Sequence, residues 1–506
     1  MIKRIYCFIF AIILFFLSLP EINLTNSDIG RHLKNGEVII KNFSVPKTNL
    51  YSYTYPDFTF YNHHWLSGVI FYLVNKISGF KGLSIFFSII TFFTFLFFLK
   101  AVEKEINSFW LLGVIFLLTI PLICVRKEIR PEIFSYFFSS VYFFILYKFL
   151  YEEKNFLYFL PILQIIWINL HIYFVVGLVL IFFSLTELIV KYLRNKNNNI
   201  KNKFYYLSFI FVLSILSCFI NPYGIKGLLL PLNIFKNYGY KVFENQSVWF
   251  IDKVVKNYIP NLNYKILTFF VLLSWTIKIK FKKIDISIFN FLYFLFFTIL
   301  SLFAIRNFAI FAYFSIPVLI LNFKELKFTK NNYFLFFIAI LYFLFSYRIN
   351  SSTWNLSFNL VGLKKGNELA AKFFQDNNLE GPILNNYDIG GYLIYYLFPK
   401  QKVFVDNRPE AYPEEFFKSI YIPMMEDETK WYAFEKIYNF NSIFFYRHDY
   451  TPFGQQFLIN RVFDPTWAVV FVDQDCIILL KRNEKNKKII EKFEISKDIF
   501  KVVKTK

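Results

Sequence analysis

Cysteine is scarce in this sequence, and its scarcity limits what the chain can be. Only 4 of the 506 residues are cysteine. Cys7, Cys124 and Cys218 lie in or beside hydrophobic segments, and Cys476 alone lies in a more polar stretch. No spacing between them is typical of a disulfide framework or of a zinc site. The sequence therefore offers neither a disulfide-stapled secreted fold nor a cysteine-ligated zinc module.

Acidic residues are also few compared with basic ones. The chain has 35 Asp and Glu against 56 Lys and Arg, which gives a formal net charge of +21. A charge of this size is often a sign of nucleic-acid binding. Here the basic residues lie in short loops between apolar runs, and membrane topology explains that placement better. We therefore expect no nucleic-acid partner.

Apolar residues dominate what is present: 56% of the chain is hydrophobic, and the mean hydropathy is +0.42. This composition predicts a polytopic α-helical membrane protein. No small-residue cleavage site follows the run at 5–20, which indicates an uncleaved first span. Residues 65–77 form a short apolar run, which we expect to lie at a shallow depth in the membrane or to form a re-entrant segment. The further candidate spans, which bring the total to about eleven, cover residues 83–99, 109–124, 133–150, 156–170, 173–190, 204–220, 266–277, 286–304, 308–321 and 333–347.

Basic residues orient these spans. With the N-terminus in the cytoplasm, every inside connection is basic, as the positive-inside rule requires. The residues concerned are Lys100, Lys104, Lys148, Lys154, Lys191, Arg194, Lys196, Lys201, Lys203, Lys278, Lys280, Lys282, Lys283, Lys324, Lys327 and Lys330. An odd number of spans then places the C-terminal part outside. We expect a multi-pass protein of the cytoplasmic (inner) membrane.

Hydropathy also divides the chain into parts. Residues 1–350 read as a transmembrane domain whose first outer loop covers 21–64. Short apolar runs that alternate with helical patterns over 356–483 predict an extracytoplasmic α/β domain. Its strands are expected in GPILNN, KVFVDN and SIFFYR and in a hairpin over WAVVFVDQDCIILLKR, with a largely parallel sheet and an antiparallel edge. Residues 484–506 read as a basic helix and tail.

The first outer loop carries a patterned stretch near its start. Ser27 is placed to cap a short helix, on which Ile29 and Leu33 begin an apolar stripe with Gly36 and Ile40. Asp28, His32 and Asn35 fall on a different face of that helix. One interpretation is an amphipathic linker in the headgroup layer with solvated charges. The other is a functional site at the membrane surface.

Ionisable residues accumulate on the predicted outer side. Because such groups are costly near membrane depth, their accumulation is a site hypothesis. The alternative is that they snorkel to outer headgroups. His171, with Asn169, is either a polar lock between helices or a ligand. The outer set comprises Asp28, His32, His63, His64, Arg126, Lys127, Glu128, Arg130, Glu132, Asn169, His171, Glu244 and Arg306.

Several short motifs resemble those of the GT-C superfamily of integral-membrane glycosyltransferases. In chain order they are DIGRHLKNGEVI, NHHWLSG, RPEIFSY, WINLHIYFVVGL, NPYGIKG and AIRNFAIFA. The chain looks most similar to a group of poorly characterised bacterial polytopic proteins of this type. Its layout is similar to that of protein mannosyltransferases and of the oligosaccharyltransferase catalytic subunit. Where that subunit has WWDYG, this chain has NYDIG over residues 386–390.

The resemblance implies an inverting transfer of a sugar from a polyprenyl-phosphate-linked donor to a glycan, lipid or protein acceptor at the outer membrane face. Such a transfer needs a carboxylate that takes the acceptor proton and cations that stabilise the departing phosphate. Asp28 matches the first-loop aspartate and is the expected base. Arg126, Arg130 and Arg306 are the expected phosphate ligands.

Further residues are expected to assist. His32, His64, Glu128 and Glu132 are accessory residues or ligands of a divalent metal, Mg²⁺ or Mn²⁺, whose presence the resemblance leaves open. Asp388, Asp406 and Arg408 are expected to bind the acceptor or to dock the outer domain, while Asp406 and Arg408 could equally form a structural ion pair. The competing class is non-enzymatic: a lipid or glycan transporter, a flippase or a surface-assembly protein. A transporter would more often show two repeated halves, and we find no internal repeat.

Overall fold

The structure is a computed structural model that describes residues 2–233, 238–280, 287–324, 333–349 and 361–500. It forms two compact units. The helical unit comprises residues 2–20, 83–233 and 241–349, and the sheet unit comprises residues 21–82, 238–240 and 361–500, within the described ranges. Three parts of the predictions lie outside the described residues. They are four of the predicted inside lysines (Lys282, Lys283, Lys327 and Lys330), the start of the predicted outer domain (356–360) and the end of the tail (501–506).

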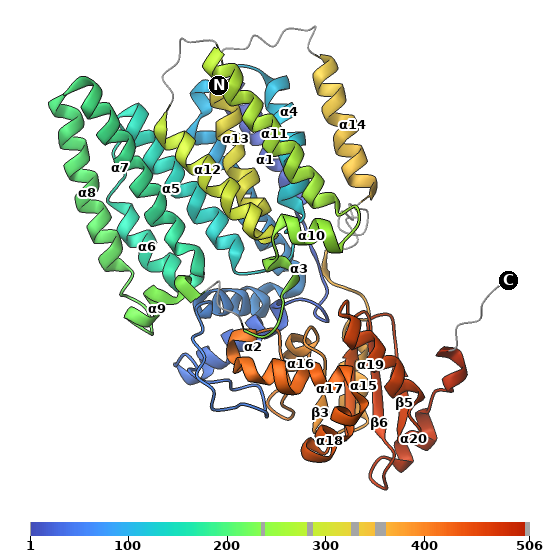
Figure 1. The fold of residues 1–506 in the computed structure, drawn as a ribbon. Coiled ribbons are helices and arrows are strands. Elements are labelled where there is room, and N and C mark those ends of the chain that lie inside the picture. The colour runs from blue at the N-terminus through green and yellow to red at the C-terminus, as the bar shows by residue number, and fades with distance from the viewer. Residues whose placement is uncertain (1, 234–237, 281–286, 325–332, 350–360, 501–506) are drawn as a thin grey trace. The chain divides into compact units, whose positions relative to one another are not determined.

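Long helices build the helical unit (Figure 1). They are α1 (Ile2–Leu17), the second half of α3 (Trp65–Ala101), α4 (Phe109–Cys124), α5 (Glu132–Glu152), α6 (Phe159–Leu170), α7 (Val175–Asn195), α8 (Asn198–Ser217), α11 (Ile259–Lys280), α12 (Ile288–Phe303), α13 (Phe308–Phe323) and α14 (Tyr333–Ile349). Short turns connect them: η1 (Glu103–Glu105), η2 (Ile172–Phe174), α9 (Ile225–Leu229), η3 (Leu230–Asn233), η4 (Phe243–Asn245), α10 (Val248–Val254) and η5 (Ile305–Asn307). Each predicted apolar run overlaps one of these long helices except the run at 65–77, which lies in the first half of α3.

Five helices in the described part of the chain are long and apolar enough to cross a membrane. They are α3, α5, α7 together with η2, α11, and α13 together with η5. Helices α4, α6 and α12 and residues Phe334–Ser346 of α14 are apolar but shorter. These helices indicate membrane association, whereas the number of spans stays a prediction.

Helix α13 is the central element of the helical unit. All its residues from Phe308 to Asn322 are buried, and it packs against α4, α11 and α12. The Phe314 ring stacks on Phe297 with 4.0 Å between centroids, and the Phe98 ring meets it edge-on at 4.9 Å. A helix that is apolar all round can be covered by protein or by lipid, and α13 is covered by the surrounding helices. It also fixes the place of η5, which precedes α13 directly.

The sheet unit contains a four-stranded sheet in the order β3-β4-β6-β5. The strands are β3 (Ile383–Leu384), β4 (Ser442–Tyr446), β5 (Trp467–Val472) and β6 (Cys476–Lys481). The helical elements are α2 (Ile29–Asn42), the first half of α3, α15 (Leu369–Asp376), α16 (Gly390–Leu397), η8 (Pro409–Ala411), η9 (Phe416–Tyr421), α17 (Ile422–Glu426), α18 (Glu428–Tyr438), α19 (Pro452–Phe463), α20 (Lys487–Phe493) and η10 (Lys497–Phe500).

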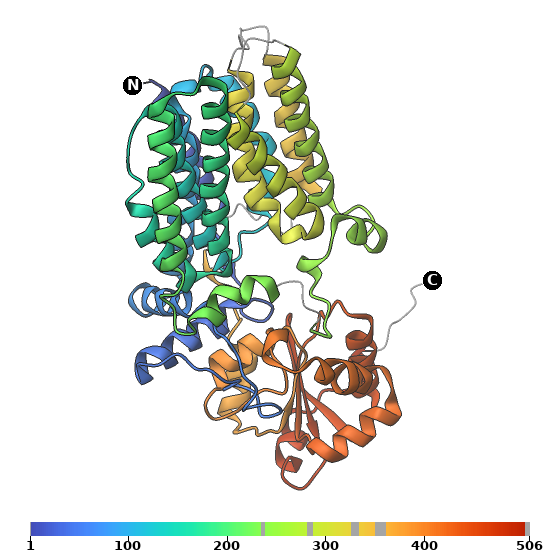
Figure 2. The same ribbon diagram turned by 60° about the vertical axis from the view of Figure 1, so that its left-hand side comes forward.

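Helices cover both faces of this sheet (Figure 2). Alternate β4 side chains point to opposite faces, as strand geometry requires. Phe444 meets Phe374 of α15 with 5.8 Å between ring centroids, whereas Phe445 meets Phe457 of α19 at 5.7 Å. All five residues of β4 are therefore buried. This explains why the strand reads as a continuous apolar run.

The prediction of a largely parallel sheet is wrong. Within the four-stranded sheet, β3 and β4 are parallel, whereas β6 is antiparallel to both β4 and β5. The crossover through α19 leaves a gap between β4 and β5, and the return strand of the predicted hairpin fills it. The hairpin itself is confirmed, so the error lies in the order of the strands rather than in their positions.

The strand predicted in KVFVDN is also wrong. In place of a ladder, Val403 bridges to the first loop: its N–H donates to the Tyr51 carbonyl at 3.0 Å, and its carbonyl accepts from the Tyr53 N–H at 3.2 Å. The Asn385 side chain accepts from the Phe404 N–H at 2.9 Å and donates to the Val405 carbonyl at 2.7 Å. A side-chain amide thus takes the role of a neighbouring strand.

The first loop packs within the sheet unit, although the predicted division assigned 21–64 to the transmembrane part. Strand β1 (Glu21–Ile22) pairs in parallel with β2 (Gly362–Leu363), and α2 packs on α16. Helix α2 begins at Ile29 with Asp28, not the predicted Ser27, at the N-cap position. Helix α3 bends at Gly79, whose φ of 63° is non-helical. The bend separates the short run at 65–77 from the longer run that follows.

Replacing Gly36 with alanine should destabilise the sheet unit. A Cβ at Gly36 would lie 2.2 Å from the Gly68 carbonyl oxygen, a backbone atom that cannot rotate away. Overpacking of this kind costs about 1–3 kcal/mol. Hydrogen exchange of α2 in the purified protein should therefore accelerate. Lys372→Ala, on the exposed side of α15, is the control and should leave exchange unchanged; equal protection in both variants would contradict the packing described.

Candidate functional site

Three arginines of the helical unit surround two glutamates, and we call these five residues the arginine cluster. Arg126 donates from Nε to Glu132 and from Nη1 to Glu244, each at 2.7 Å. Arg130 Nη1 lies 2.8 and 2.7 Å from the two carboxylate oxygens of Glu244. Arg306 Nη2 lies 3.6 Å from Glu132 and 4.0 Å from Glu244. The structure thus brings together all three predicted phosphate ligands.

Separate connections supply the members of the arginine cluster. Arg126 and Arg130 lie between α4 and α5, and Glu132 opens α5, where a carboxylate suits the helix dipole. Glu244 lies in η4 and Arg306 in η5. These two turns are joined because the Ile305 N–H donates to the Gln246 carbonyl at 3.0 Å.

The arginine cluster is largely buried and carries one net positive charge. The Glu132 and Arg126 side chains are 5% and 10% exposed, whereas those of Glu244 and Arg306 are 18% and 23% exposed. Burial alone would raise the pKa of Glu244, but Arg126, Arg130 and Arg306 hold it well below its ordinary range. Glu244 is therefore ionised at any physiological pH. Glu128 is 55% exposed and contacts only the edge of the cluster through Arg130.

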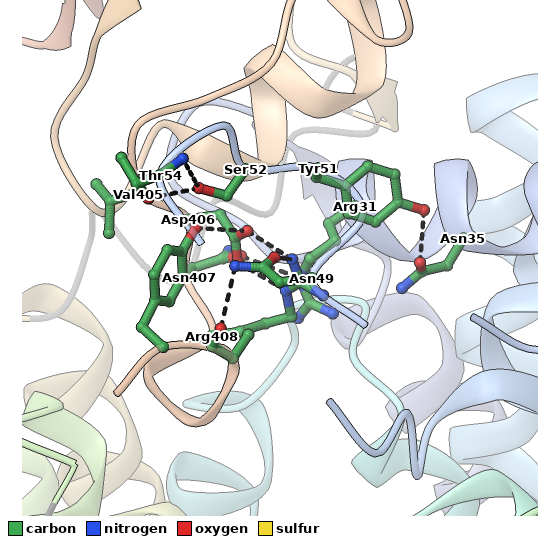
Figure 3. A network of polar contacts seen from close by, with 12 residues as sticks. Arg31, Asn35, Asn49, Tyr51, Ser52, Thr54, Val405, Asp406, Asn407 and Arg408 are labelled. Carbon is green, nitrogen blue, oxygen red and sulfur yellow. Dashed lines mark hydrogen bonds and ion pairs between the residues drawn. The ribbon is translucent and has the colours of Figure 1, made fainter. Parts of the chain in front are cut away.

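Asp28 lies in the sheet unit, where the C-terminal segment holds its carboxylate. Asn407 Nδ2 donates to Asp28 Oδ1, and Arg31 Nε donates to Asn407 Oδ1 at 3.0 Å. Arg31, His32 and Asn35 are only 1–4% exposed. The polar face of α2 is therefore packed against protein, which contradicts the interpretation of a linker with solvated charges. The hydroxyl of the buried Tyr51 donates to Asn35 at 2.6 Å (Figure 3).

Asp406 and Arg408 form a bidentate ion pair that is almost completely buried (Figure 3). Arg408 Nε and Nη2 lie 2.7 and 2.6 Å from the two carboxylate oxygens, and the side chains are 2% and 0% exposed. Arg408 also donates to Asn49 of the first loop at 2.8 Å, and its guanidinium lies 4.6 Å from the centre of the Phe60 ring. This geometry favours the structural ion pair, which attaches the first loop to residues 403–411.

The residues predicted as metal ligands do not fit a metal. The described residues contain no group of three His, Cys, Asp or Glu side chains arranged for an ion. The His32 and His64 rings lie 5.6 Å apart, but Arg31 Nη2 is 3.5 Å from His32 Nε2 and opposes a cation there. Glu128 and Glu132 are in the helical unit, where both pair with arginine.

His171 acts as a lock between helices. Its Nδ1 lies 2.7 Å from Ser135 Oγ of α5, which also accepts from Trp167 Nε1 of α6 at 2.8 Å. Nδ1 accepts from the Tyr173 N–H at 3.4 Å as well. Asn169 donates to the Ile220 carbonyl at 2.8 Å. These contacts favour the polar lock over a ligand.

Two residues of the segment 403–411, Asn407 and Glu410, were not predicted as site residues. Asn407 orients Asp28, although nothing in its sequence context marks it apart from the neighbouring Asp406. Glu410 is half-buried, and burial raises its pKa while Arg31 acts in the opposite direction. A carboxyl with a raised pKa is a second candidate for the proton acceptor.

Asp388, one of the predicted acceptor or docking residues, is half-buried. It follows Tyr387, whose ring stacks on Tyr240 with 4.1 Å between ring centroids.

Glu244 was noticed in the sequence only as part of an outer connection. Its role becomes visible when the two arginine-bearing connections are placed beside η4. The predicted site residues thus fall into two sets. One is the arginine cluster with Glu128; the other, in the sheet unit, is Asp28, His32, His64, Asp388, Asp406 and Arg408. The expected common cavity for the two sets stays a prediction.

Comparison with known proteins adds no family to these observations. The chain matches no protein-family model, and no curated protein sequence matches it significantly.

Proposed function

We propose that this protein is a membrane glycosyltransferase of the GT-C type. It transfers a sugar from a polyprenyl-phosphate-linked donor to an acceptor at the outer face of the cytoplasmic membrane. Asp28 takes the proton from the hydroxyl of the acceptor while the oxygen of that hydroxyl attacks C1 of the sugar. The carrier phosphate leaves with the electrons of the broken C1–O bond. The arginine cluster stabilises that phosphate.

The arginine cluster is the observation that carries this proposal. Guanidinium groups bind phosphate through paired, charge-assisted hydrogen bonds. Arg126, Arg130 and Arg306 come from two connections far apart in sequence, yet all three contact the same carboxylate, Glu244. A site that already binds one small anion with three arginines suits a second anion of similar shape. The helices that follow both connections, α5 and α13, are apolar, as a lipid-linked donor requires.

Asp28 supports the proposal through its environment. The side chain of Asn407 orients its carboxylate, and the helix that it starts is buried on two faces. A base fixed in this way is held ready for proton transfer without a change in fold. Within 403–411, Asp406 and Arg408 pair with each other on either side of Asn407 in the sequence.

An activity assay tests the proposal. Purified full-length protein is incubated with a panel of labelled polyprenyl-phosphate sugars and a membrane extract as the source of acceptor. We expect label to leave one donor and to enter an acceptor. A folded protein that removes sugar from no donor in the panel would contradict the proposal.

One observation favours the competing class of lipid transporter or flippase. Arg126 and Arg130 form ion pairs with Glu132 and Glu244. Ion pairs of this kind can close the pathway of a transporter by holding its helices together. Reconstitution in vesicles separates the classes. A transporter moves labelled lipid across the bilayer when no acceptor is present, and Asp28→Asn leaves that movement intact.

The proposed orientation predicts that reporters fused at two positions lie in opposite compartments. A fusion after Asn195, where α7 ends, should report the cytoplasm because the surrounding connection is basic. A fusion after Asn483, just beyond β6, should report the outer side. Alkaline phosphatase and green fluorescent protein fusions make the measurement. The same compartment for both positions would mean that the number of spans between them is not odd.

A further inference from the structure

Glu244 occupies an unusual position for a structural ion-pair partner. Its carboxylate lies within 2.7 Å of Arg126 and Arg130 and within 4.0 Å of Arg306. Three cations thus share one carboxylate. The residue lies in a three-residue turn, η4, within the connection between α8 and α11. Moving this turn breaks the hydrogen bonds from the Ile305 N–H to the Gln246 carbonyl and from Arg306 to Asn245, but it does not break a long helix.

Glu132 provides the comparison within the same cluster. It belongs to the first turn of α5, its side chain is 5% exposed, and both Arg126 and Arg306 contact it. The Glu244 side chain is 18% exposed. Glu132 is therefore held in a helix, whereas Glu244 reaches the arginines from a short turn and is the more exposed of the two carboxylates.

Arg306 shows that the carboxylates do not satisfy every donor. Its Nε–H is buried and has no hydrogen-bond partner among the described residues, while its Nη1 donates to Asn245 at 3.0 Å. A carboxylate offers two oxygens, whereas the carrier phosphate that remains after sugar transfer is a monoester, which offers three and carries about −1.5 to −2 charges at pH 7. That phosphate therefore satisfies the three arginines more completely than Glu244 does.

We propose that Glu244 is an exchangeable internal anion, which holds the arginine cluster until the phosphate of a lipid carrier displaces it. The inference rests on the proposed function for the identity of the ligand. Exchange replaces the negative charge of the carboxylate with that of the phosphate, so the arginines are never left without a counter-anion. When the phosphate departs, Glu244 re-forms its contacts and competes against rebinding.

Displacement, not protonation, must release Glu244. Because the three arginines hold its pKa well below the ordinary range, lowering the pH from 8 to 5 leaves Glu244 ionised. The ion pairs of the folded state persist throughout that window and weaken only under strongly acidic conditions. Phosphate affinity should therefore show no gain from release of Glu244 between pH 8 and pH 5.

The test measures inorganic pyrophosphate binding by the purified full-length protein. Glu244→Gln keeps the side-chain shape and removes the competing charge. Since a larger fraction of the protein then has its arginines open to an anion, the affinity for pyrophosphate should increase about ten-fold. Glu153→Gln is the matched control, because Glu153 is 75% exposed and pairs only with Lys203, and its affinity should equal that of the parent. A folded Glu244→Gln protein that binds pyrophosphate no more tightly than the parent would overturn the proposal.

Hydrogen exchange in the parent protein keeps the proposal testable if the variant does not fold. Saturating pyrophosphate should accelerate exchange at η4, where the Asn245 and Gln246 N–H groups donate to the Val242 and Phe243 carbonyls. Unchanged exchange at η4 with pyrophosphate bound would overturn the proposal and leave the phosphate site of the proposed function standing. Binding of neither pyrophosphate nor polyprenyl phosphate to any folded variant would overturn both.

Discussion

Replacing Asp28 with asparagine should lower the rate of sugar transfer by about 10²–10⁴-fold, the usual contribution of a general base. The amide has the shape of the carboxylate and can still accept the hydrogen bond from Asn407. It cannot take a proton from an attacking hydroxyl. Donor affinity should change little, because Asp28 is not one of the residues that we propose to bind the donor phosphate. Transfer rates at saturating donor measure the effect.

Asp57→Asn is the control for this substitution, because Asp57 is exposed on the same loop and should leave transfer unchanged. The alternative role for Asp28 is stabilisation of the start of α2 through the helix dipole, which is worth roughly 0.3–1 kcal/mol. That role predicts a lower melting temperature with near-normal transfer. Full activity with reduced stability would remove Asp28 from the mechanism and would turn attention to Glu410.

Replacing Asp406 with asparagine should destabilise the sheet unit by about 3–5 kcal/mol, because it leaves the buried Arg408 charge without its counter-ion. Arginine keeps its proton in proteins, so the guanidinium does not escape by losing it, although the variant lacks the carboxylate that, against the effect of burial, raises the pKa of Arg408 in the parent. The first loop should loosen together with residues 403–411, since Arg408 also bonds Asn49. Hydrogen exchange of peptides from both segments measures this joint loss.

Asp376→Asn removes an exposed carboxylate at the end of α15 and should leave exchange unchanged. Loss of protection in 403–411 with full protection in the first loop would show that Arg408 does not hold the two together. Equal protection in both variants would show that the buried charge is compensated elsewhere.

The helices were predictable because apolar runs of sufficient length have few alternatives in a membrane. The order of the strands in the sheet was less predictable. The positions of β4, β5 and β6 follow from their apolar runs, but the place of β6 between β4 and β5 depends on pairing energies that no single strand encodes. The strand prediction at Val403 was wrong because the partner of this segment, the loop at Tyr51, lies far away in the sequence.

The arginines were predictable because they lie in predicted outer connections, beside the ends of apolar runs. Glu244 was not predictable, because a lone acidic residue in a long polar connection carries no local signal. Arg408 illustrates the same limit. A charged residue at a predicted strand end can bind a ligand or pair internally, and only the positions of Asp406 and Asn49 decide between the two.

The binding of a short-chain polyprenyl phosphate to the purified protein tests the central claim most directly. The account predicts that the parent binds and that Arg306→Gln weakens binding about ten-fold or more, since a charge-assisted contact is lost. Arg4→Gln is the control, because the Arg4 side chain is 79% exposed and lies outside the arginine cluster. Equal affinity in the parent, the control and a folded Arg306→Gln protein would contradict the account.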